Sequence, residues 1–313
     1  ICGNRRRHRP AGQSLKPVAN PFAPIPDMPP RTPRCRRARY PAAGLLVLAT
    51  ALAAISAGAA DLTTVERSGG RELLLHLPQQ LPQRGSRALV VVLHGGMGNA
   101  QRISGRQSES ALNLDALADR YGFIVAYLNG TAATRMERLP ALAWNAGGGC
   151  CGQAAARNVD DVAYISAAVN DLVLRYGVDR QRVFGTGHSN GAMMGLRMIC
   201  ETEVFAAVVS YSGTLNLPVE RCPAARGRKI LAIHGSADQN VPVQGGVGSK
   251  GISQVSYASQ EHTRQVFEAS GADYHPLLLD GADHKLEHVD AQLQRQQGAS
   301  VAQETVGFFG LDR

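Results

Sequence analysis

The stretch VFGTGHSNGAMM, residues 183–194, decides the fold. Val183 and Phe184 are typical of the end of a buried strand, and the residues after Gly191 are typical of the start of a helix. The five residues Gly-His-Ser-Asn-Gly between them fit the pattern G-x-S-x-G, with Ser189 at its centre. In such a strand-to-helix turn, side chains two positions either side of the serine would collide with neighbouring elements, so glycine is needed there. The pattern is weak by itself, and its interpretation depends on the rest of the chain.

Strand-like and helix-like segments alternate along the chain. Apolar runs with strand-forming residues lie at 72–78, 88–95, 123–130, 182–187, 205–213, 229–238 and 274–284. Helical periodicity covers 111–122 and 158–177, where we expect Asn158 as the N-cap and Gly177 just past the end. This order predicts an α/β fold in which helices cover both faces of a mostly parallel sheet.

Two later strand ends carry residues that can work with Ser189. A serine hydroxyl is a poor nucleophile unless a base removes its proton and a third group orients that base. Asp238 and His284 end the runs at 229–238 and 274–284, in the order serine, acid, histidine that this turn requires. Because parallel strands present their carboxyl ends at one edge, we predict Ser189, Asp238 and His284 as the catalytic residues.

Other residues near these positions remain alternatives. Asp280, Asp283 and His288 are close enough in sequence to replace the chosen acid or base. Taken alone, Asp238 is also an ordinary turn aspartate, and His284 an ordinary surface-loop histidine.

The strand ending at residue 93 is followed by a glycine-rich loop, VVVLHGGMGNA, residues 90–100. Such a loop lets backbone N–H groups approach a carbonyl oxygen closely. We predict an oxyanion hole formed by the N–H groups of Gly96 and Asn190, with Met97 as the alternative to Gly96. We expect His94 and His188 to be packing or hydrogen-bonding residues.

Positive charge is concentrated at the start of the chain. Residues 1–60 contain ten Lys or Arg and one acid, a net charge of +9, so the remainder of the +8 chain carries −1. A basic segment (34–40), an apolar run (41–62) and small residues before the expected cut near Ala59 or Ala60 are typical of a secretory signal peptide. An uncleaved membrane anchor is the alternative. We expect residues 1–60 to be a leader, of which 1–30 are disordered or spurious, and residues 61–313 to form a single catalytic domain. The near-neutral remainder argues against nucleic-acid binding.

Export would leave four cysteines, Cys150, Cys151, Cys200 and Cys222, in an oxidising compartment. Two disulfides with three possible connectivities follow. We predict a Cys200–Cys222 bridge, which would tie the helix after the serine turn to the strand leading to the acid. A link from Cys200 to Cys150 or Cys151 is the alternative. No cysteine or histidine spacing in the sequence predicts a metal site.

Six ordered motifs resemble the secreted polyhydroxybutyrate depolymerase-like esterases, which include feruloyl esterases. They are VVLHGGMGNA, AWNAGGGCCG, NVDDVAYI, GTGHSNGAMM, FAAVVSYSG and ILAIHGSADQNVP, and the resemblance covers roughly residues 70–310. The resemblance implies an α/β-hydrolase fold, a catalytic triad of Ser189, Asp238 and His284, and a loop around Trp144 and Cys151 that borders the active site. The family often has Trp-Pro-Gly after the histidine, whereas this chain has HKLEHVD.

Two further segments have open interpretations. Trp144, the only tryptophan, is expected either to anchor its loop or to form a wall of the substrate pocket, and we assign it to substrate binding. The glycine-rich segment 241–257 is expected to be a mobile flap over the site or a disordered loop.

Together these features predict a secreted serine esterase that acts on feruloyl, acetyl or short hydroxyalkanoate esters through an acyl-enzyme. We expect no cofactor and no metal, a small-molecule or polymer ester as substrate, a monomer, and no stable membrane association after signal cleavage. A serine peptidase and a non-catalytic exported binding protein on a hydrolase scaffold are the alternatives.

Overall fold

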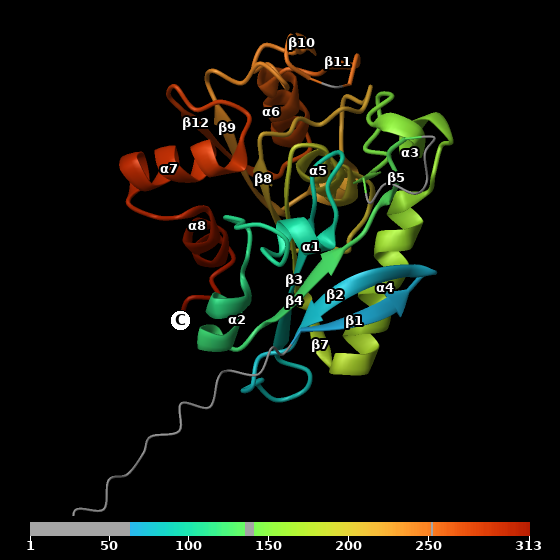
Figure 1. Cartoon of the computed structure of the whole chain (residues 1–313), viewed down its shortest axis with the longest axis vertical. Helices are drawn as coiled ribbons and strands as arrows, with labels where there is room; N and C mark the ends of the chain where they lie inside the picture. The colour runs from blue at the N-terminus through green and yellow to red at the C-terminus, as the bar shows by residue number, and fades with distance from the viewer. Residues whose placement is uncertain (1–62, 135–140, 252) are drawn as a thin grey trace, which may run out of the picture. The chain divides into compact units, whose positions relative to one another are not determined.

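An eight-stranded sheet forms the centre of the molecule in the computed structural model (Figure 1). The structure describes residues 63–134, 141–251 and 253–313, so the predicted leader and its boundary at residue 60 lie outside the described residues. The strand order is β1-β2-β4-β3-β7-β8-β9-β12, with antiparallel pairing of β2 to β1 and β4 and parallel pairing elsewhere. The strands are β1 (Thr63–Ser68), β2 (Arg71–His76), β3 (Arg87–Leu93), β4 (Ile124–Leu128), β7 (Val178–His188), β8 (Ala207–Tyr211), β9 (Lys229–Gly235) and β12 (Asp273–Leu279).

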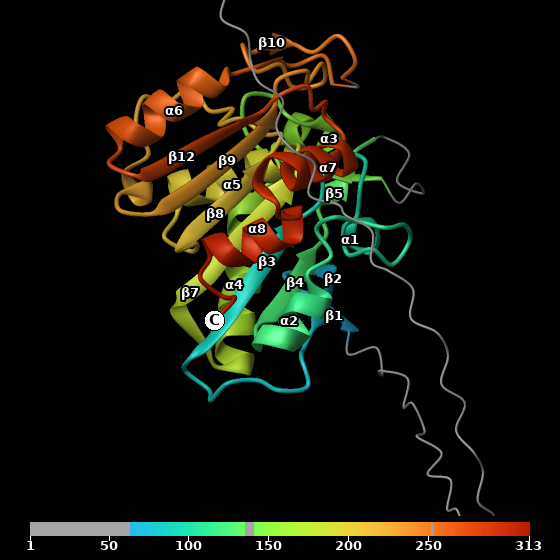
Figure 2. The ribbon, with the colours of Figure 1, turned by 90° about the vertical axis from the view of Figure 1, so that its left-hand side faces the viewer.

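Helices cover both faces of this sheet (Figure 2). One buried cluster contains apolar residues of α4, α5 and α6, and the other contains those of α1, α2, α7 and α8. The α-helices are α1 (Ala100–Ile103), α2 (Asp115–Tyr121), α3 (Gly152–Ala156), α4 (Asp161–Tyr176), α5 (Asn190–Glu201), α6 (Gln260–Ala269), α7 (Leu286–Gln297) and α8 (Val301–Phe308). A 3-10 turn (η1, Pro223–Ala225) and two short hairpins complete the elements, β5 (Thr131–Ala132) with β6 (Leu142–Ala143) and β10 (Gly246–Val247) with β11 (Ser256–Tyr257). The predicted mostly parallel sheet with helices on both faces is confirmed.

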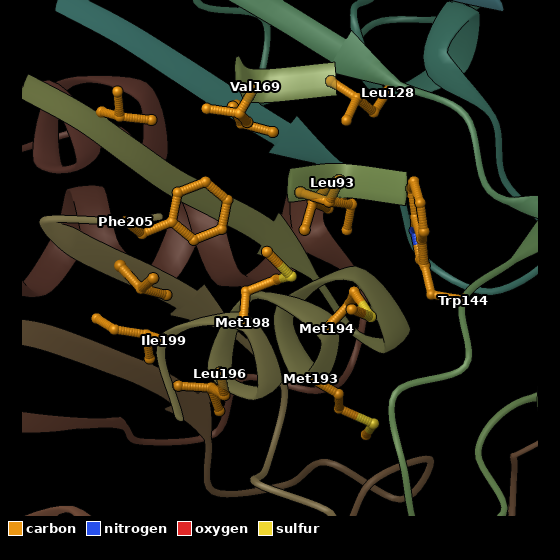
Figure 3. Close-up of a cluster of buried hydrophobic side chains, with 14 of the residues drawn as sticks. Leu93, Leu128, Trp144, Val169, Met193, Met194, Leu196, Met198, Ile199 and Phe205 are labelled. Atoms are coloured by element: carbon orange, nitrogen blue, oxygen red, sulfur yellow. The ribbon is translucent and has the colours of Figure 1, made fainter. Parts of the chain in front are cut away.

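Helix α5, which follows the serine turn, is buried along nearly its whole length. Figure 3 shows its methionine and aliphatic side chains packed among residues of β3, β4 and α4, with Trp144 at the edge of the cluster. Burying an aliphatic or methionine side chain contributes roughly 1.5–3 kcal/mol. The helix is therefore a rigid support for the turn at its N-terminus.

Several local predictions differ from the structure. The helix expected at 111–122 begins only at Asp115, and the strand expected at 229–238 ends at Gly235. The expected strand at 274–284 ends at Leu279, so His284 lies in the loop before α7. The N-cap of α4 is Asp160 rather than Asn158, because the Asp160 carboxylate accepts the Ala163 N–H at 2.9 Å. Gly177 ends this helix with a φ of 63°, as expected for a left-handed C-cap.

The cysteines pair as Cys200 with Cys222 and Cys150 with Cys151. The predicted Cys200–Cys222 bridge spans 4.5 Å between Cα atoms and ties the end of α5 to the segment before β9. Of the three connectivities open to the four cysteines, the structure contains the one that leaves the adjacent pair to close on itself.

In the part of the chain that the structure describes, no helix is both long and apolar enough to cross a bilayer.

Candidate active site

Ser189 lies in a backbone conformation that side chains rarely adopt. Strand β7 ends at His188, α5 begins at Asn190, and Ser189 between them has φ 55° and ψ −123°. Its N–H donates to the Tyr211 carbonyl at 2.8 Å, and its carbonyl accepts the Met193 N–H at 2.9 Å. A strained residue held by hydrogen bonds on both sides is typical of a functional site, and here it raises the hydroxyl at the carboxyl edge of the sheet.

The two glycines of the turn are required by the approach of β3. A Cβ on Gly187 would lie 2.6 Å from the Leu93 carbonyl oxygen. A Cβ on Gly191 would overlap the carbonyl oxygens of Leu93 and His94. The pattern G-x-S-x-G therefore follows from backbone packing against the end of β3.

The three predicted catalytic side chains form a continuous chain of hydrogen bonds. His284 Nε2 lies 2.9 Å from Ser189 Oγ, and His284 Nδ1 lies 2.7 Å from Asp238 Oδ2. Asp238 lies in the loop just after β9, and His284 in the loop between β12 and α7. The parallel strands thus bring together residues that are 46 and 95 positions apart.

The Asp238 carboxylate is buried and well supplied with donors. Its Oδ1 accepts the N–H groups of Asn240 and Val241, each at 2.8 Å, and His234 Nε2 lies 3.2 Å from its Oδ2. Burial alone would raise the pKa of Asp238, but the hydrogen bonds from His234 and His284 outweigh it and hold the pKa below its usual range. Asp238 is therefore an anion that can orient His284 across the neutral pH range.

The alternative acids and base lie apart from Ser189. Asp283 and His288 form an exposed pair with 2.9 Å between Oδ1 and Nδ1. Asp280 accepts a hydrogen bond from Ser236 Oγ at 3.2 Å. The structure brings none of these three residues to the serine.

The loop after β3 lies against the serine turn. Its Gly98 N–H donates to the Gly95 carbonyl at 3.0 Å, which closes a tight turn with Met97 at φ 64°. A Cβ on Gly96 would lie 3.7 Å from Asn190 Cβ. Within the described residues, the N–H groups of Gly96, Met97 and Asn190 have no hydrogen-bond acceptor. Such unused donors beside a serine hydroxyl are suited to hold an oxyanion, and both Gly96 and Met97 remain candidates for the first donor.

A cavity of about 510 Å³ opens beside Ser189. The described residues of the glycine-rich segment 241–257 contribute Gly251, Ser253, Gln254 and Tyr257 to its lining, which also includes Met97. None of the described residues that line this cavity is Asp, Glu, Lys or Arg. The described lining therefore offers a charged ligand no ion-pair partner, which favours uncharged ligands.

A second cavity of about 590 Å³ shares Gly95, Gly96, Met97, His188 and His284 with the first. It differs in charge, because its lining includes Arg102, Lys285, Glu109 and Glu287.

Trp144 does not line either of these cavities, so its assignment to substrate binding is corrected. Its side chain is fully buried (0% exposed), and its indole N–H donates to the His94 carbonyl at 3.0 Å. Cys151 of the same loop does line the first cavity. The loop therefore borders the site, as the resemblance implied, while its tryptophan points into the core.

Three buried or half-buried histidines surround the candidate triad. His188 Nε2 donates to the His284 carbonyl at 2.8 Å, and burial together with the nearby His284 lowers the pKa of His188 to about 3. Burial also lowers the pKa of His94 to about 4. Both are neutral hydrogen-bonding residues, in line with the expectation from the sequence. His234 was missed, although its position at the end of β9, four residues before Asp238, is the available signal.

Comparison with known proteins places these residues in a family. Residues 75–224 match the model of the family described as "Esterase PHB depolymerase". The putative esterase NocK of Nocardia uniformis subsp. tsuyamanensis is 31% identical over 237 residues, which cover 74% of this chain and 60% of the relative. The probable feruloyl esterase C of Aspergillus clavatus is 29% identical, with 57% and 58% coverage. The chain thus spans about three fifths of the length of these curated relatives.

Among solved structures, the acetyl xylan esterase from Aspergillus awamori is similar with a TM-score of 0.50 and 18% identity, over 77% of this chain and 94% of that one. This likeness concerns the fold alone. Residues 75–224 therefore match the PHB depolymerase-like esterase family, and the described part of the chain has the α/β-hydrolase fold.

Proposed function

We propose that the chain is a serine esterase that hydrolyses carboxylic esters through an acyl-enzyme. One observation carries this proposal: the hydrogen-bonded series Ser189–His284–Asp238 lies beside an uncharged cavity and unused backbone N–H groups. The match of residues 75–224 to an esterase family and the similarity to a putative esterase support the same activity.

In the proposed reaction, His284 Nε2 takes the proton of Ser189 Oγ while Oγ bonds to the ester carbonyl carbon. The carbonyl oxygen becomes an oxyanion, which accepts hydrogen bonds from the N–H groups of Asn190 and Gly96. His284 then gives its proton to the leaving alcohol oxygen as the carbon–oxygen bond breaks. A water deprotonated by His284 attacks the acyl-serine, and the acid leaves as Ser189 regains its proton. Asp238 stays ionised and orients the imidazole throughout.

The two cavities suggest which part of the ester each receives. The first cavity contains Ser189 and has no Asp, Glu, Lys or Arg among its described lining residues, so it suits a neutral acyl group. The second is also lined by His284, the group that protonates the leaving alcohol, and its charged lining suits a polar alcohol. The relatives are named as feruloyl and acetyl xylan esterases, whose acyl groups are uncharged.

We expect hydrolysis of p-nitrophenyl pentanoate with a kcat/KM at least about 100-fold above that of p-nitrophenyl hemisuccinate. The two acyl chains are similar in length, but the second would bring an unpaired carboxylate into the uncharged cavity. Initial rates at neutral pH measure the ratio. Equal values would contradict the acyl-site assignment, and failure to cleave either ester would contradict the esterase proposal.

Two other functions are compatible with the triad or with the hydrolase scaffold. A serine peptidase would use the same triad, and it would cleave a matched p-nitroanilide about as well as the ester. A binding protein on a hydrolase scaffold would not react with a fluorophosphonate. The intact hydrogen-bonded triad favours a reactive serine over the second of these.

We also propose that the protein is exported as a monomer, acts on a small or polymeric ester without a metal or cofactor, and binds neither nucleic acid nor membranes. The signal-like leader and the Cys200–Cys222 bridge support export, because disulfides persist in oxidising compartments. N-terminal sequencing of the mature protein is expected to begin near Ala60 or Asp61. An intact leader in a membrane fraction would contradict export and leave the catalytic proposal unchanged.

A further inference from the structure

Trp144 connects the two segments that carry the oxyanion donors. Its backbone N–H donates to Asn190 Oδ1 at 2.7 Å, and its carbonyl accepts from Asn190 Nδ2 at 3.0 Å. Its indole N–H donates to the carbonyl of His94 at 3.0 Å. One residue thus bonds the side chain of Asn190 at two points and the backbone of the β3 loop at a third.

Each of these bonds ends next to a candidate donor. The Asn190 side chain belongs to the residue whose own N–H lacks an acceptor in the described part of the chain. The His94 carbonyl belongs to the peptide unit that leads into Gly95 and Gly96. Because the His94 carbonyl oxygen accepts the Trp144 indole N–H, this peptide unit cannot rotate freely. The directions of the N–H groups of Gly95 and Gly96 are therefore limited as well.

Hydrogen bonds of the next residue and ring contacts of the indole fix the position of Trp144. The next residue, Asn145, donates its N–H to Asp161 Oδ2 at 2.7 Å, and Asp161 Oδ1 pairs with Arg71 at 2.6 Å. The indole ring is fully buried. Its centroid lies 6.4 Å from that of the stacked Tyr164 ring and 5.1 Å from that of the tilted His94 ring. Figure 3 shows it at the edge of the buried cluster that supports α5. These contacts give it a fixed position relative to the sheet.

We propose that Trp144 is a positioning residue for the oxyanion hole, and that its indole N–H holds the β3 loop and the serine turn at the separation the oxyanion needs. This inference rests on the proposed function. Donors contribute to the transition state only when they already point to where the charge develops, so their spacing matters more there than in substrate binding. Loss of the indole N–H should therefore lower kcat with little change in KM.

Trp144→Phe tests this, because phenylalanine keeps an aromatic ring and removes the N–H. We expect kcat for p-nitrophenyl pentanoate to fall about 10- to 100-fold, which is less than loss of a whole donor, with KM within about twofold of wild type. Affinity for a trifluoromethyl ketone of matching chain length should fall by the same factor, because the hemiketal oxyanion that forms when Ser189 Oγ adds to the ketone carbonyl needs the same donors. Rates are taken per active site, counted from the burst of p-nitrophenol.

Tyr164→Phe is the matched control. It keeps the ring that stacks on Trp144 and removes a buried hydroxyl that has no hydrogen-bond partner among the described residues. Its kcat should stay within about twofold of wild type, so a loss confined to Trp144→Phe is not a general effect of altering the ring pair.

A second substitution tests the inference if Trp144→Phe does not fold. Trp144→3-benzothienylalanine replaces only the N–H by sulfur and keeps the size and shape of the indole. It should reproduce the loss of kcat.

Three results would overturn the inference: unchanged kcat in both Trp144 variants, a raised KM with unchanged kcat, or loss of kcat without weaker binding of the ketone. These outcomes require that the wild-type protein hydrolyses the ester. If the wild type is inactive, the proposed function fails and this inference fails with it.

Discussion

Replacing Ser189 by alanine is expected to lower kcat for p-nitrophenyl pentanoate by at least about 10⁴-fold while the protein stays folded. The hydroxyl is the only group of the candidate triad that can form the acyl bond, and removing any member of such a unit abolishes most of its rate enhancement. The change removes one oxygen from a half-buried position, so the free energy of unfolding in urea should stay within about 1 kcal/mol of wild type. The fluorescence of the single tryptophan, Trp144, can follow the unfolding.

Ser212→Ala is the matched control for this prediction. Ser212 also has a positive φ, 54°, and follows the neighbouring strand β8. It is buried, and its Oγ has no hydrogen-bond partner among the described residues. We expect near-wild-type activity in this variant. Comparable losses in the two serine variants would mean that backbone strain, and not the Ser189 hydroxyl, sets the rate.

His284→Ala is expected to reduce kcat nearly as much as the serine substitution, by about 10⁴-fold. Without the imidazole, nothing accepts the Ser189 proton, and the buried Asp238 carboxylate loses its 2.7 Å hydrogen bond. Kinetics at saturating ester, with active sites counted by titration, measure the loss.

His288→Ala provides the comparison, because the two histidines lie four residues apart in the same sequence segment. His288 is exposed and pairs with Asp283, so we expect its removal to change kcat less than about twofold. A larger loss in His288→Ala than in His284→Ala would show that the base has been assigned to the wrong residue.

The parts of this site that the sequence predicts are those set by local backbone geometry and strand order. Gly187 and Gly191 are needed because β3 approaches the turn closely. Both glycines can be recognised from the pentapeptide alone. The positions of Asp238 and His284 follow from the rule that parallel strands end at one edge of the sheet. Neither inference needs any knowledge of side-chain packing.

The direction in which Trp144 points could not be predicted, because distant partners determine it. A tryptophan in a glycine-rich loop beside the site fits a substrate wall equally well. Its burial depends on Asn190, which is 46 residues away and turns its side chain back onto the loop. The predicted N-cap of α4 was wrong for a different, local reason, since Asp160 supplies the capping oxygen and Asn158 instead contacts Asn145.

Mass spectrometry after reaction with a fluorophosphonate tests the central claim, that Ser189 is the nucleophile. The wild-type protein is expected to gain the mass of one phosphonyl group, and peptide mapping should place it on Ser189. Ser189→Ala should gain none under the same conditions, whereas Ser212→Ala should react like wild type. An adduct on another residue of a protein that hydrolyses esters, or no adduct at all, would contradict the account.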